Sequence, residues 1–154
     1  MLDVNTLAFV LAAKRDKFPS FISHHRCSQT GCVANAIDEE SYQGQHREPD
    51  CTCKPIAIVE EELARILRLN QIPPVKVEVD ASGRVTLRMT EATPSSQYTA
   101  ISHVWSHGLG NQNSNALFAC QLCHIADTVS SLGGRKASSM FWMDMLCIPV
   151  NLTF

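Results

Sequence analysis

Two short apolar segments near the C-terminal end of the sequence place the strongest constraint on the fold of this chain. Residues 98–111 and 141–150 each begin with an apolar run that is typical of a β-strand and end in polar residues. Residues 116–132 between them repeat apolar side chains at helical spacing, with Asn115 as the candidate N-cap and glycines 133–134 as the stop. This order predicts a βαβ unit whose parallel strands direct polar groups to one crevice.

The remainder of the sequence divides into parts of different character. Residues 56–70 have the periodicity of an amphipathic helix, and two prolines follow them. The alternating runs 75–79 and 84–89 flank Asp80-Ala81-Ser82-Gly83, which predicts a β-hairpin. The expected organisation is an N-terminal helix (1–22, with the helix over 2–14), a Cys/His-rich segment (23–55), a helix plus hairpin (56–97) and the βαβ region (98–154).

Charge and cysteine content exclude several classes of protein. The 154 residues carry a formal net charge of -2, with no basic stretch, which argues against nucleic acid as a partner. The seven cysteines are an odd number, unlike a secreted disulfide framework. The apolar run 7–13 is too short to span a membrane and follows Asp3 rather than a basic residue. We therefore expect a cytoplasmic protein with reduced thiols.

The Cys/His-rich segment has few large aliphatic residues, so it needs something other than a core to order it. It contains five candidate metal ligands: Cys27, Cys32, His46, Cys51 and Cys53. Thiolates and imidazoles are the ligands that zinc prefers, and four of them complete a structural site. The segment therefore indicates structural zinc, and the alternative is a surface segment with free thiols.

Polar residues at the ends of the two strands are candidates for chemistry. His103 and Asp144 are candidates for proton transfer, since both are expected at the same sheet edge. Ser102 and the glycine loop with Gly108 and Gly110 are candidate cofactor-binding residues, because such a loop between strand and helix can hold a phosphate. The alternative is a connection whose glycines permit positive φ. Cys147 lies among apolar residues, which favours an inert buried thiol.

The sequence Cys120-Gln121-Leu122-Cys123-His124 matches the attachment motif of a c-type haem. It falls within the amphipathic helix, and no secretion signal precedes it. Helical spacing instead favours Cys120 and Cys123 as small residues in the core or at its boundary.

The two strand segments contain the sequence blocks YTAISHVW (98–105) and WMDMLCI (142–148). These blocks resemble the opening block and the second block of the fungal heterokaryon-incompatibility (HET) domain family. The intervening GLGN (108–111) and the helix start at 115–122 also resemble the family. The resemblance covers about the last third of the chain. The Cys/His-rich segment looks like one found upstream of the domain in some members.

The resemblance implies a fungal protein of self/non-self recognition that signals programmed cell death. It also implies a fold similar to TIR domains, which are flavodoxin-like, so we expect a partial parallel sheet preceded by the hairpin and the Cys/His-rich segment. Some TIR domains cleave NAD with a glutamate from a later helix, which has no counterpart before Phe154. We therefore expect a truncated domain without complete catalytic machinery, and protein partners that include a second copy of the chain. The alternatives are an NAD-cleaving hydrolase that uses His103, Asp144 and the glycine loop, and a zinc-stabilised interaction module.

Overall fold

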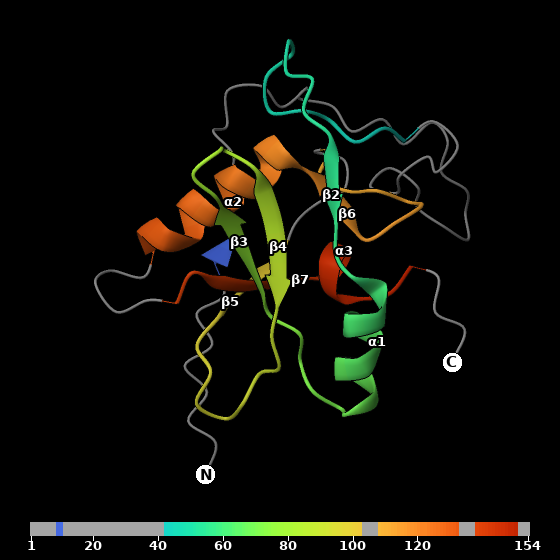
Figure 1. Ribbon diagram of the computed structural model, residues 1–154, viewed down its shortest axis with the longest axis vertical. Helices are drawn as coiled ribbons and strands as arrows, with labels where there is room; N and C mark the ends of the chain where they lie inside the picture. Colours follow the sequence, from blue (N-terminus) through green and yellow to red (C-terminus); the bar gives the residue numbers. More distant parts are fainter. Residues whose placement is uncertain (1–8, 11–41, 103–107, 133–137, 151–154) are drawn as a thin grey trace, which may run out of the picture.

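A mixed five-stranded β-sheet forms the centre of the protein, which we describe from a computed structural model (Figure 1). The structure describes residues 9–10, 42–102, 108–132 and 138–150. The sheet has the order β1-β5-β7-β3-β4. Its strands are β1 (Phe9–Val10), β3 (Val75–Val79), β4 (Val85–Met89), β5 (Thr99–Ser102) and β7 (Met140–Met143). Strands β1, β5 and β7 are parallel, whereas β3 runs antiparallel to both β7 and β4.

The βαβ unit predicted from the sequence is confirmed. Strands β5 and β7 pair in parallel with Thr99 opposite Phe141, and the helix α2 (Ala119–Leu132) lies between them in the chain. The apolar stripe of α2 is buried in the same cluster as the inward residues of β7 (Leu122, Ile125, Val129, Phe141 and Met143). Burial of this stripe against the sheet fixes the helix on it.

The hairpin is part of the same sheet and does not merely precede it. Strands β3 and β4 pair as predicted, with Val75 opposite Met89, and their turn is closed by the carboxylate of Asp80. Gly83 takes a positive φ of 82° in that turn. The other edge of β3 pairs with β7, so the expected parallel sheet is in fact mixed. The α/β class is therefore confirmed.

A second, two-stranded sheet replaces the ends of two predicted helices. Strand β2 (Pro55–Ala57) pairs antiparallel with β6 (Ala116–Phe118). The helix expected over 56–70 is therefore shorter, and α1 spans Glu60–Arg68. Acidic residues in its first turn and Arg65 and Arg68 near its end complement the helix dipole. The prediction was wrong at residues 56–57 and 116–118, because strand pairing prevails there over local helical periodicity.

Asn115 is not the N-cap of α2, since the helix begins four residues later. Its side chain is 3% exposed and donates hydrogen bonds to the carbonyls of Met145 (2.8 Å) and Ile148, while its Oδ1 accepts one from the Val150 amide. These bonds hold the chain that follows β7. That chain forms the helical turn α3 (Asp144–Cys147), whereas the sequence analysis expected a strand to continue over 141–150. A strand there would leave the Asp144 carboxylate in mid-strand, but at the start of α3 it accepts a hydrogen bond from the Met145 amide (2.8 Å).

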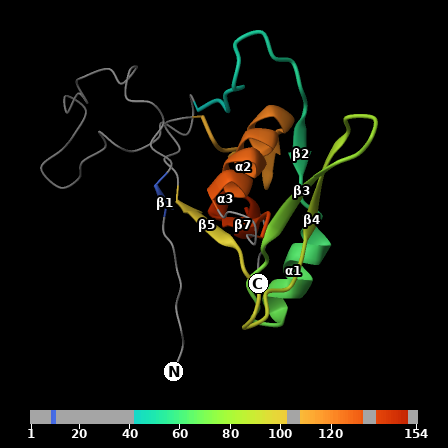
Figure 2. The same ribbon diagram turned by 90° about the vertical axis from the view of Figure 1, so that its left-hand side faces the viewer.

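Strand β1 lies beside β5 at the edge of the sheet (Figure 2). The expectation of a helix over 2–14 is wrong at Phe9 and Val10, which pair in parallel with Ile101 and Ser102. The other residues of that stretch lie outside the described part of the chain, as does the glycine stop at 133–134. Within the described ranges, none of the helices has the length and apolar character needed to cross a membrane.

Candidate metal centre

Four side chains from distant parts of the sequence meet beside the small sheet. They are His46, Cys51, Cys53 and Cys120, and their potential ligand atoms all lie within 4.8 Å of one another. The Nδ1 atom of His46 lies 3.5 Å from the Cys53 sulfur and 3.7 Å from the Cys120 sulfur. The edges of a tetrahedral zinc site with sulfur and nitrogen ligands measure about 3.5–3.8 Å, from the usual bond lengths. This group is therefore able to bind a metal ion.

The pairing of β2 with β6 brings the two halves of this group together. Pro55 lies opposite Phe118 in that ladder, and the Ala119 amide donates a further hydrogen bond to the Lys54 carbonyl (3.2 Å). Cys53 and Cys120 each lie two residues beyond the last pair of that ladder, so the pairing brings them close together. The short sheet thus positions one thiol of the Cys/His-rich segment against the first turn of α2.

Backbone amides point at two of the sulfurs. The Cys120 amide donates to the Cys53 sulfur at 3.4 Å, and the Arg47 amide donates to the Cys120 sulfur, also at 3.4 Å. Hydrogen bonds of this kind to a ligand atom hold it in the orientation that metal binding needs. The local backbone is therefore arranged for metal-bound sulfur.

Side chains around the group hold His46 in place and set the local charge. The ring of His46 stacks on that of Phe118 with centroids 3.8 Å apart. The guanidinium of Arg47 contacts Nδ1 of His124. Burial and the charge of Arg47 lower the pKa of His124, which favours a neutral ring at this position. Burial raises the pKa of the Cys123 thiol, and the nearby Asp127, Cys120 and Cys53 add to that effect.

The side chain of Gln121 connects the Cys/His-rich segment to the glycine loop by hydrogen bonds. Its side-chain amide donates to the carbonyls of Gln45 (2.6 Å) and Gly108 (2.9 Å), and its Oε1 accepts from the Phe118 amide. Gly108 has a φ of 73°, and a Cβ on it would lie 2.6 Å from the side chain of Gln45. A Cβ on Gly44 would lie 2.9 Å from the Gly110 carbonyl. The glycines are thus required for the close approach of two backbones.

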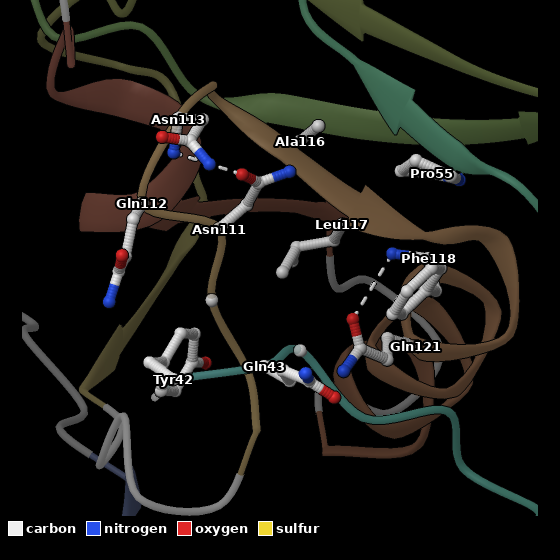
Figure 3. Close-up of a pocket in the computed structure, with 12 residues that line it drawn as sticks. Tyr42, Gln43, Pro55, Asn111, Gln112, Asn113, Ala116, Leu117, Phe118 and Gln121 are labelled. Carbon is white, nitrogen blue, oxygen red and sulfur yellow. Dashed lines mark hydrogen bonds between the residues drawn. The ribbon is translucent and has the colours of Figure 1, made fainter. Parts of the chain in front are cut away.

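A cavity of about 300 Å³ is lined by residues of this contact, among them Gly44, Gly110 and Gln121 (Figure 3). It is lined by Tyr42, Gln43, Gly44, Pro55, Gly110, Asn111, Gln112, Asn113, Ala116, Leu117, Phe118 and Gln121. None of these described residues has a charged side chain, and Tyr42 is the only one with a titratable group, whose pKa is raised by burial. The lining therefore offers amides for hydrogen bonding rather than groups for proton transfer at neutral pH.

The outcome for the predicted ligands is mixed. Of the five, the structure brings together His46, Cys51 and Cys53, while Cys27 and Cys32 lie outside the described residues. The fourth member of the group, Cys120, was missed. The sequence analysis interpreted it as a core or boundary residue, because helical periodicity explained its position. A useful signal was its place two residues after the apolar run 116–118, which mirrors the place of Cys53 two residues before 55–57.

The predicted catalytic and cofactor residues lie only partly within the described ranges. His103 lies outside them, and the Asp144 carboxylate accepts a hydrogen bond from the Met145 amide at the start of α3. Ser102 ends β5 and is exposed. The Gly108 carbonyl accepts from the Gln45 amide, and Gly110 lines the cavity. The prediction of an inert Cys147 is consistent with its position, since it is 2% exposed and burial raises its pKa to about 12.

Comparisons with protein-family models, with curated proteins and with solved structures found no match for this chain.

Proposed function

We propose that this chain is a zinc-stabilised α/β module of the HET type, which signals through protein contacts. The observation that carries the proposal is the convergence of His46, Cys51, Cys53 and Cys120. Three thiolates and one imidazole form a set that selects zinc among the common metals. Four protein ligands fill a tetrahedral site and leave no open position for a substrate, so the role of the metal is structural.

The position of the metal centre supports this structural role. The ligands join a segment with little apolar surface to the first turn of α2, which belongs to the βαβ unit. In the segment from 42 to 54 no residue is fully buried, so hydrophobic burial contributes little to its docking. Zinc binding is coupled to folding in such cases, because the site exists only in the folded chain.

The HET-type part of the proposal rests on the residues of the two sequence blocks. The described parts of these blocks form the parallel pair β5 and β7, with α2 between them, which is compatible with a TIR-like sheet. The proposed signalling role is recognition and cell death in a fungus, with other proteins or further copies of the chain as partners. The proposal assigns no catalytic activity to the chain.

Metal analysis of the purified chain tests the zinc centre. We expect about one equivalent of zinc per chain after desalting, because four protein ligands usually retain zinc tightly. Cys120→Ser removes one ligand and should lose the metal, while Cys123→Ser on the next turn of the same helix is the matched control and should keep it. The proposal would be contradicted if both variants kept their zinc. It would also be contradicted if the wild type bound no zinc after reconstitution with the metal.

Induced expression in a fungal host tests the signalling role. We expect the wild-type chain and Cys123→Ser to slow growth, and Cys120→Ser to be inactive at equal abundance. Equal growth of induced and uninduced cultures argues against a HET-type function. Incubation of the purified chain with NAD should release no nicotinamide, and release above that of a heat-denatured sample would favour the hydrolase alternative.

A further inference from the structure

We infer that the metal centre is also a thiol switch, in which a peroxide joins Cys53 to Cys120 and expels the metal. This inference rests on the proposed zinc centre and adds a form of regulation to it. The step takes two metal-bound thiolates and one peroxide. The two sulfurs are oxidised to a disulfide, the peroxide takes up two protons and is reduced to two molecules of water when it is hydrogen peroxide, and the zinc ion leaves.

Access to the centre permits this reaction. His46, Cys51, Cys53 and Cys120 are all partly exposed, so a small oxidant reaches their sulfurs without unfolding of the chain. Cys147 has the opposite environment, since it is buried and its thiol donates a hydrogen bond to the Pro73 carbonyl (3.2 Å). It provides an internal control for any thiol-specific reagent.

The backbone contact beside the small sheet selects the pair that is oxidised. Lys54 and Ala119, which are adjacent in the chain to Cys53 and Cys120, are joined by a backbone hydrogen bond of 3.2 Å, and the sulfurs of Cys53 and Cys120 lie within 4.8 Å of each other. The two cysteines are therefore close enough to form a disulfide with little movement of the backbone. The Cys53 sulfur already lies 3.4 Å from the Cys120 amide.

Two competing pairs fit less well. Cys120 and Cys123 are three residues apart on α2, where Cβ atoms lie about 5–6 Å apart, whereas a disulfide needs about 3.5–4.5 Å. That bond would require the first turn of the helix to unwind. Cys51 and Cys53 are separated by one residue, and a bond between them would close a small ring that departs from the preferred disulfide geometry.

The expected consequence is that a disulfide replaces the metal as the link between the Cys/His-rich segment and α2. In the zinc form the metal ties the Cys/His-rich segment to α2, and in the oxidised form the disulfide ties the same two backbones at the same point. Only the reduced, metal-free chain lacks both. We therefore expect the segment to be released when a chelator acts under reducing conditions, but not when peroxide removes the metal.

The test treats the zinc-loaded chain with hydrogen peroxide and maps its disulfides under non-reducing conditions by mass spectrometry. We expect release of one zinc per disulfide, a predominant Cys53–Cys120 link, and recovery of zinc binding after addition of dithiothreitol. Cys123→Ser should give the same link. A predominant bond that pairs Cys120 with Cys123, or either cysteine with Cys27, Cys32 or a second chain, would overturn the inference.

Trypsin cleavage after Arg47 reports on the docking of the segment. We expect cleavage at least about tenfold slower in the zinc and oxidised forms than in the reduced, metal-free form, because the site must open locally to be cut. Equal rates of trypsin cleavage in the oxidised form and in the reduced, metal-free form would contradict the replacement of the metal by a disulfide. Metal content is measured first, so a chain that never binds zinc refutes the proposed function, while a zinc-binding chain with another oxidation product refutes only the switch.

Discussion

The core beneath the five-stranded sheet and the metal centre beside the small sheet are held together by different means. The core is made of buried apolar side chains, and its cysteine, Cys147, packs among them while its thiol donates a hydrogen bond to the Pro73 carbonyl. The metal centre contains partly exposed thiols that lie close together and accept backbone hydrogen bonds. The same residue type thus serves packing in one region and ligation in the other, and its neighbours decide which.

The largest effect on stability should come from a substitution in the core, and it should not depend on the metal centre. Phe141 is 0% exposed and lies at the contact of β7 with β5 and β3. We expect Phe141→Ala to lower the free energy of unfolding by about 3–5 kcal/mol, because it leaves a cavity. Urea denaturation measures the change, and Val79→Ala on the same sheet is the control, since Val79 is 58% exposed. The loss should be the same with and without a zinc chelator, and a loss that depends on the chelator would mean that the two regions are coupled.

Removal of the metal should have the next largest effect. A chelator should lower the stability of the wild type by about 3–4 kcal/mol when zinc had been present at roughly a hundred to a thousand times its Kd. The same chelator should leave Cys120→Ser unchanged, because that variant has no site to lose. Thermal unfolding of both proteins, each with and without chelator, gives the four values needed. A fall of equal size in Cys120→Ser shows that the chelator acts elsewhere.

The sequence predicted the core far better than the metal centre, for a physical reason. The hairpin at 75–89 is encoded locally, because alternating residues and the turn chemistry of Asp80 and Gly83 specify it without help from the rest of the chain. The βαβ unit follows from periodicity in the same way. The pairing of β3 with β7 is not local, and it produced the mixed sheet in place of the expected parallel one.

The ligand Cys120 escaped prediction because ligation depends on a contact across 67 residues. Three-residue strands such as β2 and β6 carry almost no local signal, and residues 116–118 fit a helical pattern equally well. The within-segment ligands were recognisable, because residues of the right chemistry lie close together in the sequence. The Asp144 turn was missed for a similar reason, since a helix of one turn is too short to show periodicity.

Asn115 offers a third test, since it connects the two regions through polar bonds. Asn115 directly precedes β6, and its side chain makes hydrogen bonds with the backbone of Met145 and of Val150. We expect Asn115→Ala to lower the free energy of unfolding by about 2 kcal/mol, because it removes hydrogen bonds to the buried Met145 carbonyl and to the partly buried backbone groups of Ile148 and Val150. The exposed Gln97→Ala serves as the control in the same denaturation series. If the cost matches that of the control, the hydrogen bonds of Asn115 contribute nothing to stability.

The smallest effect on stability is expected at the hairpin turn. An acid titration distinguishes this effect from the loss of zinc at the metal centre. Hydrogen bonds from the Ser82 hydroxyl, and then from the Arg84 and Ser82 amides, lower the pKa of Asp80 below its usual value of 3.8. A carboxylate with a lowered pKa stabilises the fold above its pKa in the unfolded chain, and this contribution is lost as the pH falls through the folded pKa. Zinc leaves earlier in such a titration, because protons compete for its thiolate ligands at higher pH.

Two signals followed together in one acid titration can distinguish these events. We expect zinc release to be complete before the side-chain NMR resonance of Asp80 titrates, at a pH below 3.8. Asp80→Asn keeps an oxygen acceptor for the Ser82 and Arg84 amides but has no charge. It should therefore be slightly less stable than the wild type at neutral pH and equal to it once Asp80 is protonated. A midpoint for Asp80 at or above 3.8 would contradict the lowered pKa, and a midpoint that moves when zinc is removed would show that the hairpin and the metal centre are not independent.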